Sequence, residues 1–178
     1  STSAKGSLGE GVIMAEAAGA NIIDMQYIQL HPTCHPKTGV MSYLAAGSYI
    51  DGGLLINQQG KRFVNELERR DVVAKAIVEQ TGNVAYVIWP QELEESSRSL
   101  ELYPSEYTAM LADKLITKAN TLDEAADFFG IDKNQLKQTI QNWGEYAAKQ
   151  VDPDFNKDGN MLSFAEGPYY IQKITPSA

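Results

Sequence analysis

Cysteine is almost absent from this sequence of 178 residues, and long apolar runs are missing as well. Because Cys34 is the one cysteine, no disulfide can form within the chain, and the redox compartment stays open. No apolar stretch approaches the roughly 20 residues that cross a bilayer. The first residues also lack the apolar core of a signal peptide. The sequence predicts neither a membrane segment nor a secretory signal.

Positive charge is also in short supply. Lysine and arginine number 15 against 23 acidic residues, which gives a net charge of −8 and a pI of about 4.7. Nucleic-acid binding needs clustered basic side chains to neutralise phosphates, so that class of function is not expected. The length suits one domain, and with 43% hydrophobic residues the chain can bury a core.

Metal ligands are too few for a convincing metal site. A closed zinc site needs four ligands, and His31, Cys34 and His35 are the only histidines and cysteine available. Residues 154–159 copy the first half of a calcium loop, but the twelfth position is Ala165 where a bidentate glutamate is required. We therefore expect a solvated acidic turn there and no metal.

Residue spacing predicts an α+β fold in a single cap-type domain, with a small mixed sheet in the N-terminal half and helices following. Residues 40–49 fit a strand or a helix equally well. Helices are expected over residues 9–19, 70–80, 92–115, 121–129 and from Asp132 to Ala147, and the third of these should break near Pro104. Strands are expected over residues 21–30, 84–89 and 169–174, and a hairpin over residues 54–64.

Three short motifs carry candidate chemistry, and each also has a plain structural interpretation. His31 ends an apolar stretch, where an imidazole can donate to a carboxylate or simply occupy a surface loop. Arg69 and Arg70 begin a helix, and spacing alone cannot say which of them faces a pocket. The glycine-rich residues 6–11 precede a helix whose backbone N–H groups can approach an anion, although the spacing is not the dinucleotide fingerprint.

The order of these motifs resembles one known family. Gly9-Glu10-Gly11 leads into the helix from Met14 to Ala20, the stretch from Asp24 ends in His31-Pro32-Thr33, and Gly60 to Leu67 is followed by Arg70-Asp71. This order resembles the soluble fumarate reductase and flavocytochrome c flavoproteins, within the wider succinate dehydrogenase/fumarate reductase flavoprotein family. The resemblance is strongest from Gly6 to Trp89.

The resemblance implies a cap domain that covers a substrate on an FAD-binding domain. In that family, FAD supplies a hydride to one alkene carbon of an unsaturated carboxylate, and a cap arginine delivers a proton to the other. The match of Asn-Glu-Leu-x-x-Arg-Asp assigns this role to Arg70 rather than Arg69. His31, Thr33 and Tyr43 are then expected to bind substrate. Gly9, Glu10 and Gly11 are expected to contact FAD, which is held mainly by residues outside this chain.

Residues 40–53 depart from the family pattern. They hold no glutamate and no arginine, which are the usual proton relay, and Tyr43 stands near the position of a threonine that binds the second carboxylate of fumarate. An aryl acrylate therefore fits better than fumarate, because the tyrosine ring can enclose an uncharged group. Asp51 is a weaker candidate for a substitute relay acid.

The same resemblance implies that the chain is a piece of a longer protein. Residues 1–30 would form a junction of helix and strand from the FAD-binding domain, 31–165 the cap, and 166–178 a return strand toward the FAD-binding domain of the same parent chain. Alone, the piece should be inactive and bind FAD weakly or not at all. Two alternatives stay open: a non-catalytic interaction module, and the cap of a fumarate reductase or another flavoprotein dehydrogenase.

Overall fold

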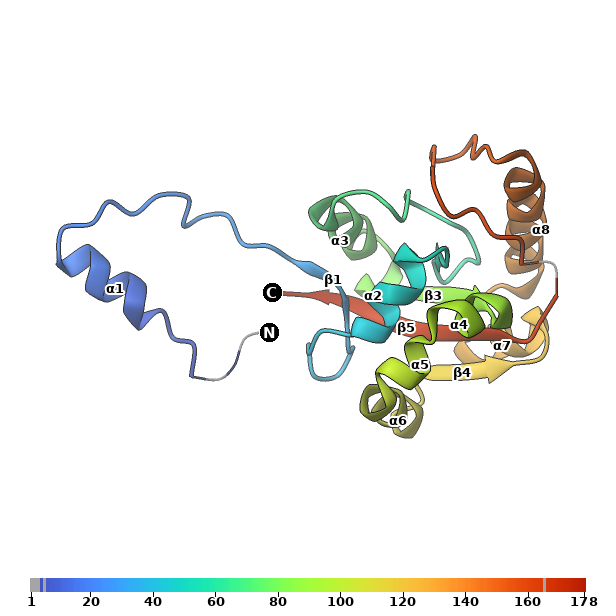
Figure 1. Ribbon diagram of the computed structural model, residues 1–178, viewed down its shortest axis with the longest axis horizontal. Coiled ribbons are helices and arrows are strands. Elements are labelled where there is room, and N and C mark those ends of the chain that lie inside the picture. Colours follow the sequence, from blue (N-terminus) through green and yellow to red (C-terminus); the bar gives the residue numbers. More distant parts are fainter. Residues whose placement is uncertain (1–3, 5, 165) are drawn as a thin grey trace.

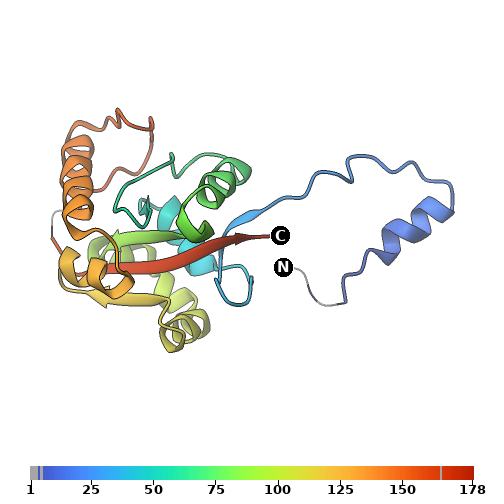
Figure 2. The same ribbon diagram turned by 180° about the vertical axis from the view of Figure 1, so that it is seen from behind.

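The computed structural model describes residue 4, residues 6–164 and residues 166–178. It consists of an α/β body and an extended arm, residues 6–30, that projects from one end of the body (Figure 1). The C-terminus lies on the side of the body from which the arm leaves (Figure 2). None of the described helices is both long and apolar enough to span a bilayer.

The elements of the body follow one another as short strands and helices. The strands are β1 (His31–Cys34), β2 (Leu54–Ile56), β3 (Ala85–Pro90), β4 (Ile116–Ala119) and β5 (Tyr169–Ser177). The helices are α1 (Glu10–Ala17) in the arm, then α2 (Tyr43–Ile50), α3 (Arg70–Val78), α4 (Gln91–Ser97), α5 (Ser99–Leu102), α6 (Pro104–Ala112), α7 (Leu122–Phe129) and α8 (Lys133–Lys149), with a 3₁₀ turn η1 (Thr81–Asn83).

The last strand of the chain is the centre of the sheet. β5 pairs with β3 over Tyr169–Ile174 and with β4 over Tyr169–Gln172, so it lies between them, and its end pairs with β1. β2 extends the sheet beyond β3. The α+β class is confirmed. The expected mixed sheet in the N-terminal half is wrong, because the described strand pairs are all antiparallel and β4 and β5 come late in the chain.

Helices cover both faces of the sheet, which explains why all six residues of β3 are buried. Val87 and Trp89 point into a core shared with α2, α3, α4 and α6. Tyr86 and Ile88 point the other way, into a core shared with α7 and α8. A strand buried on both faces shows a continuous apolar run instead of alternation, as the sequence does here.

Side-chain caps correctly predict where α7 and α8 begin. The Thr121 hydroxyl accepts from Glu124 N at 3.2 Å and begins α7, and an Asp132 carboxylate oxygen accepts from Gln135 N at 2.9 Å and begins α8. The helix expected over 92–115 is instead three helices, because Arg98 adopts a left-handed conformation between α4 and α5. Pro104 then begins α6, where its missing N–H has no cost.

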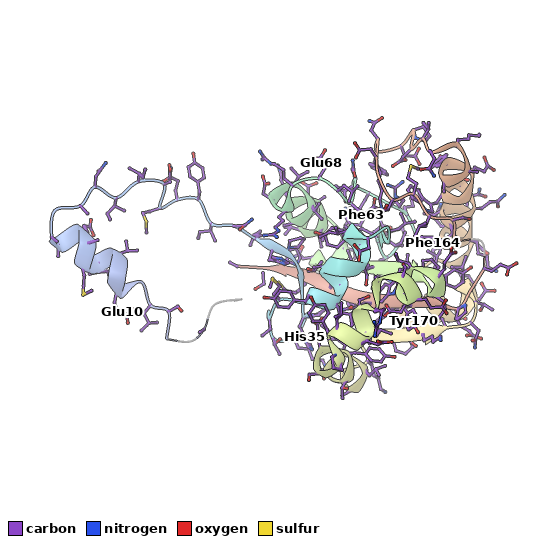
Figure 3. The ribbon with its side chains drawn as sticks, viewed as in Figure 1. Glu10, His35, Phe63, Glu68, Phe164 and Tyr170 are labelled. Carbon is purple, nitrogen blue, oxygen red and sulfur yellow. The ribbon has the colours of Figure 1, made fainter. Side chains whose placement is uncertain are left out.

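The strand expected over residues 21–30 is absent. These residues run as an exposed segment without regular structure, and Ile23, Met25, Tyr27 and Ile28 are each more than 60% exposed. In Figure 3 the arm's side chains, among them Glu10, project from a ribbon that no other element accompanies. The prediction failed because an apolar pattern reports a buried surface, and no described part of this chain covers the arm.

Candidate functional site

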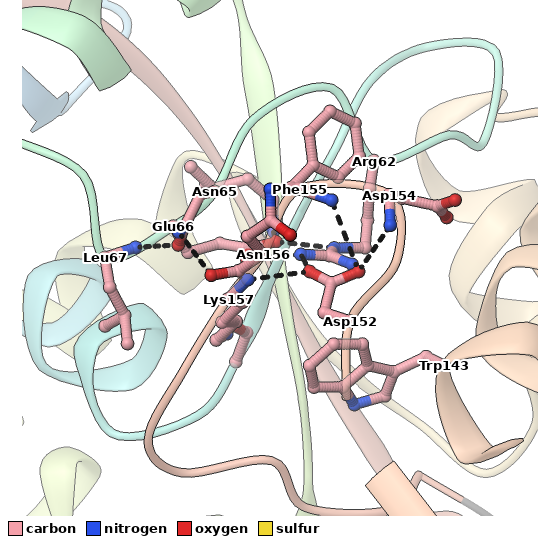
Figure 4. Close-up of polar contacts among 12 residues, drawn as sticks. Arg62, Asn65, Glu66, Leu67, Trp143, Asp152, Asp154, Phe155, Asn156 and Lys157 are labelled. Atoms are coloured by element: carbon pink, nitrogen blue, oxygen red, sulfur yellow. Dashed lines mark hydrogen bonds and ion pairs between the residues drawn. The ribbon is translucent and has the colours of Figure 1, made fainter. Parts of the chain in front are cut away.

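The hairpin after β2 holds an arginine whose Nε and Nη2 atoms bind carboxylates. Arg62 donates to Glu66 through Nε at 3.0 Å and through Nη2 at 2.9 Å, and Nη2 also reaches Asp152 at 2.9 Å (Figure 4). Its guanidinium lies 4.7 Å from the centre of the Trp143 ring. Burial by itself would lower the pKa of Arg62, but the two carboxylates outweigh burial and raise it. This arginine is a structural element of the motif.

The turn that imitates half a calcium loop is anchored by a lysine. The Lys157 side chain is fully buried, and its ammonium donates to the carbonyl of Gly53 at 2.9 Å and lies 3.3 Å from Glu66 Oε2. Burial lowers the pKa of Lys157, and Glu66 offsets this only in part. In the described part of the chain, no three His, Cys, Asp or Glu side chains come together as a metal-binding group.

Gly60 explains why the motif needs glycine before its Lys-Arg pair. The residue has a φ of +76°, and a Cβ there would lie 2.7 Å from both Asp132 O and Leu136 N at the start of α8. Thr139 also donates to the Gly60 carbonyl at 2.6 Å. The turn is thus seated directly on α8, and a side chain at this position would force the two apart.

The next arginine pair separates cleanly in the structure. Arg69 precedes α3 and forms a surface ion pair with Asp71, at 2.7 Å between Nη2 and Oδ2. Arg70 is the first residue of α3, and no carboxylate in the described part of the chain forms an ion pair with it. Its charge acts instead on His31 and on the buried Tyr49 of α2. Arg69 is thus held by a neighbouring carboxylate, and within the described residues Arg70 is not.

His31 begins β1 and lies close enough to Arg70 to be affected by its charge. Partial burial and then Arg70 lower the pKa of His31, so the ring favours its neutral form. The Thr33 N–H donates to His31 Nδ1 at 3.4 Å. A ring that accepts at Nδ1 carries its hydrogen on Nε2 when neutral. The contact of the Thr33 N–H with Nδ1 thus favours the tautomer whose N–H donor is Nε2.

Thr33 and Tyr43 stand on either side of the loop that leads into α2. Thr33 is fully buried, and its hydroxyl donates to the Ser42 carbonyl at 3.2 Å. The contacts of Thr33 therefore hold His31 and the loop in place. Tyr43 is the first residue of α2, is 52% exposed, and stacks on Tyr103 with ring centres 5.7 Å apart. Its exposed ring is available to a ligand.

The remaining sequence candidates lie elsewhere. Cys34 is buried in β1, and burial raises the pKa of its thiol. His35 Nε2 lies 3.0 Å from Asp113 Oδ2. Asp51 ends α2 in a recess with Ser96 and Asn160 that includes neither His31 nor Arg70, and burial raises its pKa. The relay role considered for Asp51 therefore gains no support from the geometry.

Gly9, Glu10 and Gly11 lie in the arm, at the start of α1. Gly9 precedes the helix with a φ of +83°, and the helix has no side-chain cap. None of the residues of α1 is buried. The start of this helix thus exposes backbone N–H groups, although Glu10 places a carboxylate in the first turn.

Sequence reasoning missed one acidic residue beside the site. Glu106 of α6 reaches the first N–H groups of α2, 63 residues away in sequence from Tyr43. No local signal could have revealed the contact, because it depends on how α6 packs against the loop before α2.

Comparison with known proteins decides the family. A family model described as an FAD binding domain matches residues 1–178. The chain belongs to this FAD binding domain family. It is 38% identical over 177 residues to a urocanate reductase of Eggerthella lenta, and 36% identical over 176 residues to a fumarate reductase (cytochrome) of Shewanella frigidimarina. Each alignment covers 99% of this chain and 29% of the relative, so the chain spans less than a third of their length.

Solved structures agree with the fold. The open conformation of a flavocytochrome c3 fumarate reductase superposes with a TM-score of 0.75 at 27% identity, covering 95% of this chain and 28% of that one. A solution NMR structure of a fumarate reductase flavoprotein subunit from Lactobacillus plantarum gives a TM-score of 0.63 at 27% identity. That match covers 79% of this chain and 95% of the other, so a chain of similar extent has been studied in solution. The family expected from the motifs is confirmed.

Proposed function

We propose that this chain is the substrate-covering part of an FAD-dependent reductase that reduces the C=C bond of an α,β-unsaturated carboxylate. The observation that carries the proposal is the packing of α3, which begins with Arg70, against β1, which begins with His31. Burial first, and then the charge of Arg70, lower the pKa of His31. The two residues bring a fixed positive charge and a neutral N–H donor to one place. Relatives whose names include urocanate, fumarate and acrylate support this chemistry.

Each residue has a separate role in the proposed reaction. His31 donates from Nε2 to a substrate carboxylate, and Thr33 holds the ring through its backbone N–H. Arg70 delivers a proton to one alkene carbon. Its guanidinium is available for this role because no carboxylate within the described chain forms an ion pair with it. A bound FAD, held mainly by residues outside this chain, would supply the hydride that the other carbon needs, so that one hydride and one proton add across the double bond. An arginine acid must be reloaded after each turnover, since the guanidinium holds its proton strongly.

We infer that the substrate is an aryl acrylate rather than fumarate. Tyr43 offers a half-exposed ring backed by Tyr103, and aromatic faces favour stacked partners. Tyr43 also stands near the position of the family's threonine that binds the second carboxylate of fumarate. The similarity to a urocanate reductase, which is named for an acid with an aromatic ring, supports the same choice.

The described residues fit a contact with FAD but do not enclose it. The start of α1 exposes N–H groups at Gly9–Gly11 that a phosphate or flavin oxygen could accept, and a Cβ built at Gly9 or Gly11 would meet no other atom within 4 Å. We propose that residues 1–30 join an FAD-binding domain, that 31–165 form the cap, and that 166–178 return toward that domain. The isolated chain is then inactive and binds FAD weakly.

The test uses the longer protein, if the gene continues on both sides of this segment. The purified flavoprotein is assayed with a reduced electron donor against fumarate, urocanate, cinnamate and methacrylate. We expect urocanate or cinnamate to have the highest kcat/KM, and the isolated chain to show no turnover and no stoichiometric flavin absorbance. Fumarate turned over best by orders of magnitude would contradict the aryl acrylate assignment, and no turnover of any of these acids would contradict the reductase.

A further inference from the structure

The N-terminus of α2 is unusual because every one of its N–H groups is already used by the protein. The first four N–H groups of a helix have no partner inside the helix. Here Ser42 N donates to the Thr33 carbonyl at 2.7 Å, and Ala45 N donates to Ser42 Oγ at 3.1 Å. The two between them, Tyr43 N and Leu44 N, donate to one carboxylate oxygen of Glu106, at 3.0 and 3.3 Å.

The Glu106 carboxylate is held by three groups at once. Its second oxygen accepts from the Ser42 hydroxyl. That hydroxyl is fixed in turn by Gln172 of the central strand, whose Nε2 donates to it at 2.9 Å. No lysine, arginine or histidine of the described chain forms an ion pair with Glu106. Among the described residues, the charge of Glu106 is therefore balanced by the backbone N–H groups and the hydroxyl at the start of α2.

A helix N-terminus attracts anions, since its N–H groups and its dipole both favour negative charge. When the protein's own carboxylate fills this position, a second anion meets repulsion and finds no donor left. Tyr43 is both the ring expected to face substrate and the residue whose N–H Glu106 occupies. The filled position and the exposed ring are thus parts of one surface.

We propose that Glu106 is a specificity-determining residue that excludes a second substrate carboxylate at the start of α2. The inference rests on the proposed function, and it defines the substrate class as acrylates with one carboxylate and an uncharged group next to Tyr43. Simple capping does not require Glu106, because Ser42 already caps the helix and solvent commonly satisfies the first two N–H groups.

The experiment compares Glu106→Ala and Glu106→Gln with the wild type in the full-length flavoprotein. The readout is the ratio of kcat/KM for fumarate to kcat/KM for cinnamate. Removing the charge and the filling group in Glu106→Ala should raise this ratio at least about tenfold, the scale of an anion at a partly buried helix N-terminus. Glu106→Gln removes the charge but keeps a side chain of the same size in place, so it should raise the ratio by less. Glu101→Gln is the matched control, because Glu101 pairs with Arg98 on the exposed surface nearby and should leave the ratio unchanged.

A purely structural role gives a different result. If Glu106→Gln folds with bound FAD and lowers kcat/KM for both acids by the same factor, or leaves the ratio within about twofold of wild type, the inference is overturned. The Gln variant decides the matter even where Glu106→Ala fails to fold.

Failure of the proposed function is recognised separately. A wild-type protein that reduces none of the acids contradicts the reductase, and binding then tests Glu106. Succinate and 3-phenylpropionate are titrated against the absorbance of the bound flavin. Tighter succinate binding in Glu106→Gln, with 3-phenylpropionate unchanged, supports the inference, and equal changes in both overturn it.

Discussion

Two arginines of one sequence stretch have opposite surroundings. Arg62 has a side chain only 4% exposed and bonds to Glu66 and Asp152, while Arg70, eight residues later, lies at the surface and forms no ion pair within the described chain. A charge that the fold has already neutralised cannot serve a ligand. A charge at the start of a helix that has no ion-pair partner within the described chain can bind a ligand. The motif therefore joins a buried, paired arginine to an exposed arginine, to which we assign the proton transfer in the proposed reaction.

The contrast extends to what each arginine affects. Arg62 joins the hairpin, the loop at Asp152 and the ring of Trp143 into one cluster (Figure 4). Arg70 acts on a histidine of another strand. Substitution of Arg62 should therefore show in stability, and substitution of Arg70 should show in chemistry.

The largest expected effect is on turnover. Arg70→Gln in the full-length flavoprotein should lower kcat by about 100- to 10,000-fold, the usual loss when a general acid is removed. FAD content and Tm should stay close to wild type, because no described ion pair is broken. Steady-state kinetics with cinnamate, together with the flavin absorbance of the purified variant, would measure this.

Arg69→Gln is the control for this experiment. It removes the same charge one residue earlier, where the arginine only pairs with Asp71 on the surface. We expect kcat to change by less than about twofold, since exposed ion pairs contribute little. Equal losses in the two variants would mean that Arg70 acts through general electrostatics rather than as a proton donor.

Arg62 should show the second largest effect, in stability. Arg62→Met leaves Glu66 and Asp152 buried with only Lys157 to balance them, and breaking a buried pair on one side costs about 3–5 kcal/mol. Urea unfolding of the isolated chain, followed by circular dichroism, would give the free energy of unfolding. Arg98→Met is the control, because the Arg98–Glu101 pair is exposed, and its loss should be hard to detect.

Asp152 offers a smaller effect with a defined pH dependence. Burial by itself would raise the pKa of Asp152, but the hydrogen bond and charge of Arg62 outweigh burial and hold the pKa below 3.8. The stabilisation is fully present above the unfolded-state pKa and is lost as the pH falls through the lower folded-state value. Asp152→Asn should cost about 1–3 kcal/mol at pH 7.

The acid limb of the stability curve checks the sign of this effect. The difference between wild type and Asp152→Asn should shrink as the pH falls below 3.8, because the wild-type carboxylate then becomes neutral too. Unfolding free energies measured from pH 7 to pH 2 would show it. A difference that stays constant across this range would mean that Asp152 contributes through shape alone.

Sequence could predict those parts of the fold that depend on neighbours along the chain. Thr121 and Asp132 cap α7 and α8 with their own side chains, so the pattern that predicts each helix is complete within a few residues. Gly60 of the hairpin and the apolar run of β3 can likewise be recognised from neighbouring residues alone. Only the family motif could favour Arg70 over Arg69, and this choice stays a prediction; the structure adds that Asp71 binds Arg69.

The rest depended on contacts between distant residues. The sheet's centre is its last strand, which no local pattern can indicate, since pairing with β3 joins residues such as Ala85 and Ile174. Glu106 reaches α2 in the same way. The strand expected over 21–30 failed for the opposite reason, because its apolar side chains have no covering partner in the described chain.

The smallest expected effect concerns the open arginine directly, and the isolated chain is sufficient to measure it. Because the Arg70 charge helps to lower the pKa of His31, Arg70→Gln should raise that pKa toward 6.5, and partial burial should keep it below this value. NMR titration of the ring protons separates His31 from His35, the other histidine. Arg69→Gln should leave the pKa of His31 unchanged. If neither variant moves it, burial alone sets the pKa of His31, and the approach of Arg70 to His31, on which the proposed function depends, is not present in solution.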